Sequence, residues 1–273
     1  MNIVVCIKQV PDTTNVRINP ETNTLMREGV ASIINPFDAY ALEEGVRLKE
    51  KHGGKVTVIS MGPPQVESAL REAISLGADE AVLMSDRAFA GADTLATAYT
   101  LAAGIRKLGG ADLLLMGRQA IDGDTGQVGP GVAENLGLPH VTDVRKIEQI
   151  DADGTIVLER LLEEGYLRLK IRLPMIMTVV KEINEPRLPS LKGKLAAKKA
   201  VVTVWTAKDL ELDAVRIGLN GSPTQVMKIF TPPKPAGGKV FQGDVHQAVA
   251  QLLEELQKAG IRIGQAKAEA SRG

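Results

Sequence analysis

The sequence predicts an α/β protein built on a doubly wound, mostly parallel sheet, with an antiparallel extension and a terminal helix. Over the first 140 residues, short continuous apolar runs alternate with helical patterns. Runs of this kind are typical of parallel strands whose two faces are both covered by helices. After residue 140, strand-like segments with partial alternation follow one another, with a strong Asp153-Gly154 turn between two of them. This change predicts antiparallel strands added to the parallel core.

The elements of the core follow in order along the chain. Apolar runs predict parallel strands at 3–7, 55–61, 80–84 and 112–117. The first helix begins at Asn35-Pro36, because asparagine suits the N-cap and proline the first helical position, and it ends at Gly53-Gly54. Further helices are predicted over 63–78, 92–110 and 128–136, and strand-like segments over 141–150, 154–162, 166–173 and 175–181. Together these elements predict a Rossmann-like core.

Beyond residue 183 the composition changes again. A proline-bearing basic stretch at 184–200 shows little core, and a proline- and glycine-rich stretch at 231–239 is typical of a linker. Residues 241–259 have an apolar stripe at helical spacing, which must pack on this chain or on a partner. We therefore expect three parts: an α/β domain with its antiparallel extension, an arm, and a terminal helix with its tail. Their ranges are 1–183, 184–240 and 241–273.

Composition argues against several classes of protein. Lysine plus arginine equals aspartate plus glutamate, 33 each, so no basic balance indicates nucleic-acid binding. No uninterrupted apolar stretch approaches the roughly 20 residues of a membrane span. The single cysteine, Cys6, rules out an internal disulfide and suits a small buried hydrophobe in a reducing compartment. The three histidines show no metal-ligand spacing. We expect a cytoplasmic protein without a metal site.

The stretch LLLMGRQAIDGDTGQVGPG, residues 113–131, carries the clearest sign of function. A buried strand ends at Gly117, and a glycine-rich loop leads into the next helix. Ligands of open α/β sheets bind beyond the carboxyl ends of the strands. The N–H groups from Thr125 to Gly129 have no helical partner and lie at the positive end of a helix dipole, so the backbone alone can bind an anion. Thr125 and Gln127 add side-chain donors. The alternative is a glycine-rich loop without a ligand.

The loop contains no lysine and no Walker-type motif. Phosphoryl transfer needs a cation and usually magnesium, so the pattern favours a nucleotide that is held and not cleaved. Asp122 and Asp124 are typical of turns or of ribose anchors. A hydrolase that uses them as catalytic carboxylates remains an alternative, but it needs magnesium ligands or a base that the sequence does not display. We expect no catalytic residue.

Four motifs in order resemble the β subunits of electron transfer flavoproteins: IKQVPDT (7–13), NPFDAYALEEGVRLKE (35–50), GRQAIDGDTGQVGP (117–130) and NEPRLPSL (184–191). The resemblance runs over nearly the whole chain. It implies a heterodimer with an α subunit, FAD at the subunit interface, and electron acceptance from partner dehydrogenases such as acyl-CoA or 2-hydroxy-acid dehydrogenases.

The resemblance also implies a second adenine nucleotide enclosed by the β subunit. Its contacts would fall on the first strand, the first helix start, the end of the second strand and the glycine-rich loop. These residues are Cys6, Asn35, Pro36, Phe37, Asp38, Met61, Asp122, Gly123, Asp124, Thr125, Gly126, Gln127, Val128, Gly129, Pro130, Gly131, Val132 and Ala133. The segment 184–191 resembles the family's recognition loop, with Leu191 as the docking leucine beside Pro189 and Lys192. An ordinary solvated basic loop is the alternative.

The second nucleotide is either AMP or a second FAD. The loop here resembles the electron-bifurcating branch, which holds FAD and takes electrons from NADH, as do GLNGSPTQV (218–226) and the stretch before the terminal helix. Glycine at 123 and 126 leaves room for a pyrophosphate. The segment 218–226 offers backbone and hydroxyl donors to a flavin ring. A respiratory-type subunit with AMP is the first alternative, and a universal-stress-type homodimer that binds ATP without flavin is the second.

Overall fold

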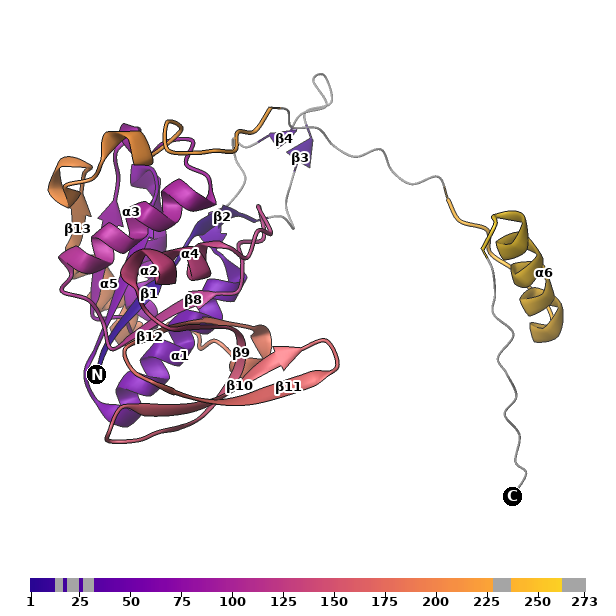
Figure 1. Ribbon diagram of the computed structural model, residues 1–273, viewed down its shortest axis with the longest axis horizontal. Helices are drawn as coiled ribbons and strands as arrows, with labels where there is room; N and C mark the ends of the chain where they lie inside the picture. Colours follow the sequence, from indigo (N-terminus) through magenta and orange to yellow (C-terminus); the bar gives the residue numbers. More distant parts are fainter. Residues whose placement is uncertain (13–16, 19–24, 27–31, 228–236, 262–273) are drawn as a thin grey trace. The chain divides into compact units, whose positions relative to one another are not determined.

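The computed structural model describes residues 1–12, 17–18, 25–26, 32–227 and 237–261. The chain divides into two compact units, Met1–Phe230 and Thr231–Gly273. In the first unit helices cover both faces of one large sheet (Figure 1). In the second unit the described residues contain helix α6 (Val245–Lys258). Most of the predicted linker at 231–239 lies outside the described residues.

The sheet has nine strands in the order β11-β10-β9-β12-β8-β1-β6-β7-β13. Strand β1 lies between β6 and β8 and pairs with both in parallel. Its side chains alternate between two cores: Ile3 and Val5 pack on one face, and Val4 and Cys6 on the other. Because both faces are covered, the strand reads as a continuous apolar run. The parallel strands are β1 (Asn2–Cys6), β6 (Lys55–Met61), β7 (Glu80–Met84), β8 (Leu113–Gly117), β12 (Met175–Val179) and β13 (Val202–Trp205). The prediction of a doubly wound, mostly parallel sheet is confirmed.

Three helices cover one face of the sheet and two cover the other. Helices α1, α2 and α5 contribute to one apolar cluster, and α3 and α4 to the second. The inner face of α2, which includes Leu70 and Ile74, is buried. The bounds are α1 (Pro36–His52), α2 (Glu67–Leu76), α3 (Thr94–Lys107), α4 (Val128–Leu136) and α5 (Leu191–Lys199).

The antiparallel extension consists of three strands, not four. Strands β9 (His140–Ile150), β10 (Thr155–Leu162) and β11 (Gly165–Arg172) pair in antiparallel fashion. Asp153-Gly154 lies in the turn between β9 and β10, where Gly154 has φ 81°. Strand β12 was predicted to belong to this extension, but it lies in the parallel core between β8 and β9. All five of its residues are buried, so it needs apolar side chains on both faces.

Residues 184–205 add to the first unit more structure than the basic composition predicts. Helix α5 packs on α2 through its small residues: a Cβ on Gly193 would lie 2.1 Å from Ser75 O, and Ala197 is buried. Arg71 donates to the carbonyls of Ala197 and Ala200 at 2.9 and 3.0 Å, which satisfies the end of the helix. Strand β13 then joins the sheet beside β7.

Short elements complete the described residues. Two small ribbons follow β1, and several single 3-10 turns connect larger elements. The ribbons are formed by β2 (Gln9–Pro11) with β5 (Ser32–Ile34) and by β3 (Arg17–Ile18) with β4 (Leu25–Met26). The 3-10 turns are η2 (Pro64–Val66), η3 (Arg87–Phe89), η4 (Lys181–Ile183), η5 (Lys208–Leu210) and η6 (Ala214–Arg216).

Candidate nucleotide-binding site

The carboxyl ends of the central parallel strands bring the predicted site residues to one edge of the sheet. Strands β1, β6 and β8 end there at Cys6, Met61 and Gly117, in parallel register. The start of α1 is tied to the exit of β1, because Asn35 N donates to Lys8 O at 2.8 Å. Four segments that are distant in sequence therefore meet at the edge where doubly wound folds bind their ligands.

Asn35 occupies the N-cap position of α1, as predicted, but its side chain does not cap the helix. Its amide nitrogen donates to Gln119 O at 2.9 Å, and its amide oxygen accepts from Ile121 N at 3.1 Å. The residue is fully buried. Both ends of the side-chain amide are therefore used to hold the first part of the glycine-rich loop against α1.

Asp38 links the same loop to the exit of β1. Its carboxylate accepts from Lys8 N at 2.7 Å and from Gly117 N at 3.0 Å. Burial raises the pKa of Asp38 to about 7, while hydrogen bonds from the Lys8 backbone, Asn35 and the Gly117 backbone act in the opposite direction. A Cβ on Gly117 would lie 2.4 Å from the Asp38 Oδ1, so only glycine allows this close approach.

Lys8 supplies to the loop the lysine that the loop's own sequence lacks. Its ammonium lies 2.6 and 2.8 Å from the two carboxylate oxygens of Asp122. Sequence reasoning missed this residue because it considered only lysines inside the loop. A signal existed, since Lys8 directly follows the predicted strand 3–7, and parallel strand ends share one edge. Half of the Lys8 side chain remains exposed.

The second part of the loop leaves backbone donors open. Helix α4 has no side-chain cap, and among the residues that the structure describes no acceptor is found for the N–H groups of Val128 and Gly129. Asp124, at φ 50°, accepts from the Gln119 side chain at 2.9 Å, and Gln127 accepts from Thr94 Oγ1 at 3.0 Å. The loop is thus shaped by local bonds, while the positive end of α4 stays available to an anion.

The four loop glycines divide into two pairs. A Cβ on Gly123 would meet nothing within 4 Å, and one on Gly126 only Arg118 O at 3.8 Å. A Cβ on Gly129 would lie 2.4 Å from Thr178 Cγ2, and one on Gly131 2.9 Å from Ala98 Cβ. The first pair therefore borders open space, as a bound ligand needs. The second pair is required for packing α4 on the sheet and on α3.

Several other predicted contact residues lie in the core. Val132 and Ala133 are fully buried in the cluster under α3 and α4, and Cys6 is buried in the same cluster. Burial raises the pKa of the Cys6 thiol to about 12, which is consistent with its prediction as a small hydrophobe. Pro36 is exposed and Phe37 half-buried at the start of α1. The side chains of these buried residues are engaged in core packing.

The segment 218–226 is anchored beside the loop by its own hydroxyl groups. Ser222 Oγ donates to Gly218 O at 2.7 Å and accepts from Asp93 N at 2.8 Å. Thr224 Oγ1 donates to Asp93 Oδ2 at 2.8 Å. The hydroxyl donors predicted for a flavin ring are therefore engaged within the chain, because they hold the segment to the N-cap of α3.

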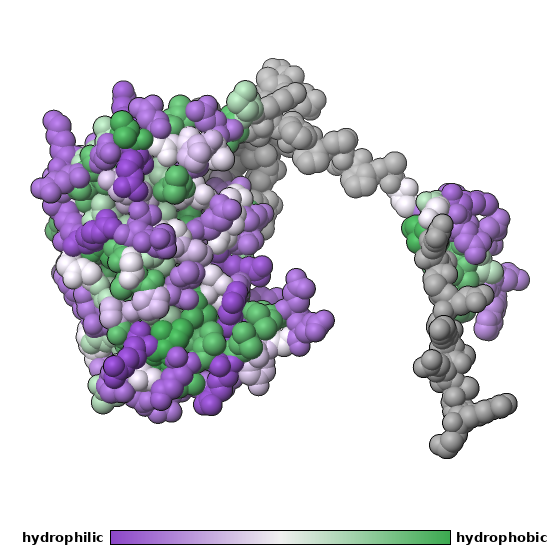
Figure 2. All heavy atoms as spheres, viewed as in Figure 1, coloured by the Kyte–Doolittle hydropathy of each residue, from purple (hydrophilic) through white to green (hydrophobic). Residues whose placement is uncertain are grey.

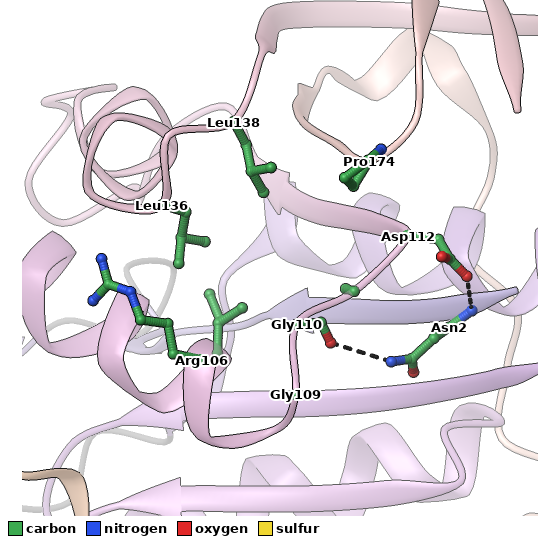
Figure 3. Close-up of a pocket in the computed structure, with 10 residues that line it drawn as sticks. Asn2, Arg106, Gly109, Gly110, Asp112, Leu136, Leu138 and Pro174 are labelled. Atoms are coloured by element: carbon green, nitrogen blue, oxygen red, sulfur yellow. Dashed lines mark hydrogen bonds between the residues drawn. The ribbon is translucent and has the colours of Figure 1, made fainter.

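A cavity at the opposite, amino edge of the sheet contains none of the predicted site residues. Figure 3 shows Asn2, Arg106, Leu136 and Pro174 around a space of about 560 Å³. Asn2 Nδ2 donates there to Gly110 O at 3.1 Å. The candidate site instead consists of the glycine-rich loop and the N-termini of α1 and α4 at the carboxyl edge.

Two features are absent from the part of the chain that the structure describes. Within it, His, Cys, Asp and Glu side chains form no group of three that could hold a metal ion. In the same residues no helix combines the length and the hydropathy that crossing a bilayer requires.

The fold and this edge define a doubly wound α/β protein with a glycine-rich loop before a helix whose N-terminus has no side-chain cap. The electron transfer flavoprotein domain model matches residues 22–210. The chain is 56% identical to the electron transfer flavoprotein subunit beta of Thermoanaerobacterium thermosaccharolyticum, over 94% of this chain and 98% of the relative. It is 48% identical to the caffeyl-CoA reductase-Etf complex subunit CarD of Acetobacterium woodii, over 96% and 100%. It is 50% identical to protein FixA of Azorhizobium caulinodans, over 85% of each chain.

The chain belongs to the electron transfer flavoprotein family, among its beta subunits. Membership implies association with a flavin and with an alpha subunit.

Proposed function

We propose that the chain binds FAD at the glycine-rich loop and relays electrons between NADH, the FAD at the interface with the alpha subunit, and a partner flavin dehydrogenase, by flavin-based electron bifurcation. The observation that carries the proposal is the open end of the loop. Gly123 borders free space, and the N–H groups of Val128 and Gly129 lack acceptors among the described residues. Free space and unpaired backbone donors suit an elongated diphosphate. A loop that only connected a strand to a helix would need neither.

The residues of this chain would bind and orient, and none would act as acid, base or nucleophile. The N-terminus of α4 and the backbone of 125–129 would hold phosphate oxygens, and Asp122 or Asp124 would bond ribose hydroxyls. The buried Cys6 at the end of β1 and the half-buried Met61 at the end of β6 would exclude water from one side of the nucleotide. A flavin, when bound, supplies the redox chemistry.

AMP at the same site is the alternative, with the chain then a respiratory-type carrier subunit. The two nucleotides share the adenosine and one phosphate, so the contacts at α1 and α4 do not separate them. The space at Gly123 favours the longer ligand. A universal-stress-type module is a weaker alternative, because membership in the flavoprotein family argues against it.

Nucleotide release tests this proposal. The full-length chain, purified with its alpha subunit, is denatured, and the released nucleotides are separated and counted. Two FAD per heterodimer support the proposal, whereas one FAD and one AMP restrict the chain to the respiratory type. Rapid flavin reduction by NADH without a partner dehydrogenase is the second expected result. An ATP-binding homodimer without flavin would support the universal-stress alternative.

Helix α5 and the segment before it support the proposed docking of a partner dehydrogenase. Arg187 holds this segment on α1 through bonds of 2.8 Å to Glu43 and 2.6 Å to Glu50. Leu188 is 89% and Leu191 77% exposed. Because Gly193 and Ala197 face α2, helical geometry turns the leucines of α5 outward. These leucines are Leu191 and Leu195.

The rim of this surface is basic, with four lysines and no acidic residue between Leu188 and Ala200. It suits an apolar pocket with an acidic border. We assign this surface, with Leu191, Pro189 and Lys192 at its centre, to an acyl-CoA or 2-hydroxy-acid dehydrogenase. The name of the Acetobacterium relative links that protein to a caffeyl-CoA reductase, which favours the acyl-CoA class here.

Two further assignments complete the proposal. Helix α6 has an outward apolar stripe, with Val245 72% and Val249 48% exposed, and we assign it to binding the alpha subunit. We also assign the protein to the cytoplasm, because its one cysteine is a free, buried thiol.

A further inference from the structure

The first half of the nucleotide loop is held by two side chains from α1. Asn35 bonds the loop backbone at Gln119 O and Ile121 N, and Asp38 bonds it at Gly117 N. The amide of Asn35 and the carboxylate of Asp38 belong to buried residues. Asn35 is 0% and Asp38 7% exposed.

We propose that Asn35 and Asp38 are positioning residues, whose side chains fix the backbone of residues 117–121 before a nucleotide binds and do not themselves contact it. The proposal rests on the proposed nucleotide site. It changes the role of two residues at which the family resemblance implies ligand contacts, because their polar atoms are already engaged with the chain.

The missing cap of α1 supports this role. An asparagine at an N-cap normally accepts from the N–H of the second or third helical residue. Here the amide turns to the loop, and helix α1 has no side-chain cap. Among the described residues no acceptor is found for Phe37 N–H. The Asn35 side chain therefore stabilises the loop and does not stabilise the N-terminus of α1. As a result, the N-terminus of α1, like that of α4, keeps a free N–H at the ligand edge in the part of the chain that the structure describes.

Asp38 performs a similar task between two strands. Each of its two carboxylate oxygens accepts a backbone N–H, one from the exit of β1 at Lys8 and one from the end of β8 at Gly117, and the Asn35 side chain adds a further bond. The carboxylate therefore sets the spacing of the two strand exits between which the loop begins. An asparagine at this position could accept only one of these two backbone bonds, since its NH₂ group would face the other backbone donor.

The ionised carboxylate of Asp38 accepts both backbone bonds. In the protonated form one oxygen carries an O–H donor, which would face a backbone N–H that is also a donor. The charged or titratable groups that face it are the Lys8 ammonium and the Cys6 thiol from β1 and, through Lys8, Asp122 from the loop. Because burial brings the pKa of Asp38 to about 7, the loop should be better ordered above neutral pH. Nucleotide affinity is therefore expected to rise between about pH 6 and about pH 8.

The test compares two pairs of isosteric variants in the full-length chain with its alpha subunit, stripped of nucleotide. Asn35→Asp and Asp38→Asn change the proposed residues. Asn2→Asp and Asp112→Asn make the same changes at the amino edge, where Asn2 Nδ2 bonds Gly110 O and Asp112 accepts from Asn2 N at 2.6 Å (Figure 3). The probe is ADP-ribose, which contains the adenylate part of both candidate nucleotides and has no phosphate monoester, whose second pKa is about 6.

We expect Asn35→Asp and Asp38→Asn to weaken ADP-ribose binding at least about tenfold, and the amino-edge variants less than about twofold. The affinity of the unaltered protein should rise severalfold between about pH 6 and about pH 8, and that of Asp38→Asn should stay flat. Equal affinities for all four variants, or a pH profile that Asp38→Asn leaves unchanged, overturns the proposal. No binding of ADP-ribose, AMP or FAD to the unaltered protein instead contradicts the proposed function itself.

Hydrogen exchange of the unaltered protein gives a readout that does not depend on variant folding. Without nucleotide, the N–H groups of Lys8, Gly117 and Ile121 should exchange slowly, because side chains of α1 accept from them. Those of Val128 and Gly129 should exchange fast and become protected when ADP-ribose is added. Fast exchange at Gly117 and Ile121 before ligand addition rejects the proposal.

Discussion

Glycine at position 123 and glycine at position 129 lie six residues apart in one loop, yet they have different physical reasons to be glycine. A side chain at 123 would enter open space, and a side chain at 129 would enter Thr178. In the sequence both are simply members of a glycine-rich loop. Only the packing of α4 in the structure distinguishes their roles. The sequence therefore predicts a glycine-rich loop at the carboxyl edge of the sheet but not the role of each glycine.

Alanine at these two positions should affect stability very differently. Gly129→Ala places a Cβ 2.4 Å from Thr178 Cγ2 and should lower the free energy of unfolding by about 1–3 kcal/mol. Gly123→Ala, the matched control, should stay within about 0.5 kcal/mol. Urea denaturation of both variants measures the difference. Equal stabilities would show that α4 does not pack as closely as described.

Aspartate at position 123 should separate the two candidate nucleotides. Gly123→Asp adds a negative charge where the pyrophosphate of FAD would pass, and the open space lets the side chain fit without strain. We expect FAD binding to weaken at least about tenfold, which is about 1.4 kcal/mol, with AMP binding changed much less. Titration of the stripped protein with each nucleotide measures this. An unchanged affinity for FAD would show that its pyrophosphate does not pass beside Gly123.

The stability of the protein should depend on pH through Asp38. Its pKa is about 7 in the folded chain against an ordinary value of 3.8. Between these values the folded state keeps a proton that the unfolded chain has lost, so the contribution to the free energy of unfolding falls as pH rises. The full effect is at most about 4 kcal/mol. In Asp38→Asn this component should vanish, as denaturation at several pH values will measure; an unchanged pH slope would assign it to other groups.

At the scale of elements, strand β12 and helix α5 show where sequence patterns mislead. The run MIMTV follows three alternating segments and was grouped with them, although its unbroken apolar character is that of a parallel strand. Helix α5 inverts the usual pattern. Its inner face is made of Gly193 and Ala197, and its leucines lie outside, so a search for large buried residues finds no core there.

The outward leucines of α5 should serve docking and not folding. Leu191→Ser removes an apolar group that is 77% exposed, so stability should change by less than about 0.5 kcal/mol. Electron transfer to the partner dehydrogenase should fall about tenfold or more if this leucine is an anchor. Val201→Ser, also highly exposed at 85% but outside the leucine row, is the control. Equal rates for both variants would remove docking from this surface.

Exposed apolar side chains also gather on the antiparallel extension. Figure 2 shows hydrophobic residues over the region of β10 and β11, where Leu162 is 40% and Leu167 46% exposed. Such an uncovered face of an antiparallel sheet is typical of an interaction surface. Sequence alternation predicted the strands but gave no account of this face.

At the scale of the molecule, the order of β-strands and helices was predictable for a simple reason. Parallel strands covered on both faces produce continuous apolar runs, and right-handed crossovers leave few topologies. The edge at which the site lies follows from the same rule. Long-range side-chain bonds, such as those from Asn35 and Lys8 to the loop, carry no local signature and required the structure.

The identity of the nucleotide held by the loop tests the account most directly. The full-length chain is purified with its alpha subunit without added nucleotide, denatured, and the released nucleotides are quantified per heterodimer. The account predicts two FAD and no AMP, one FAD from this chain's loop and one from the subunit interface. One FAD together with one AMP would contradict it, because the loop would then hold a structural nucleotide in place of a second flavin.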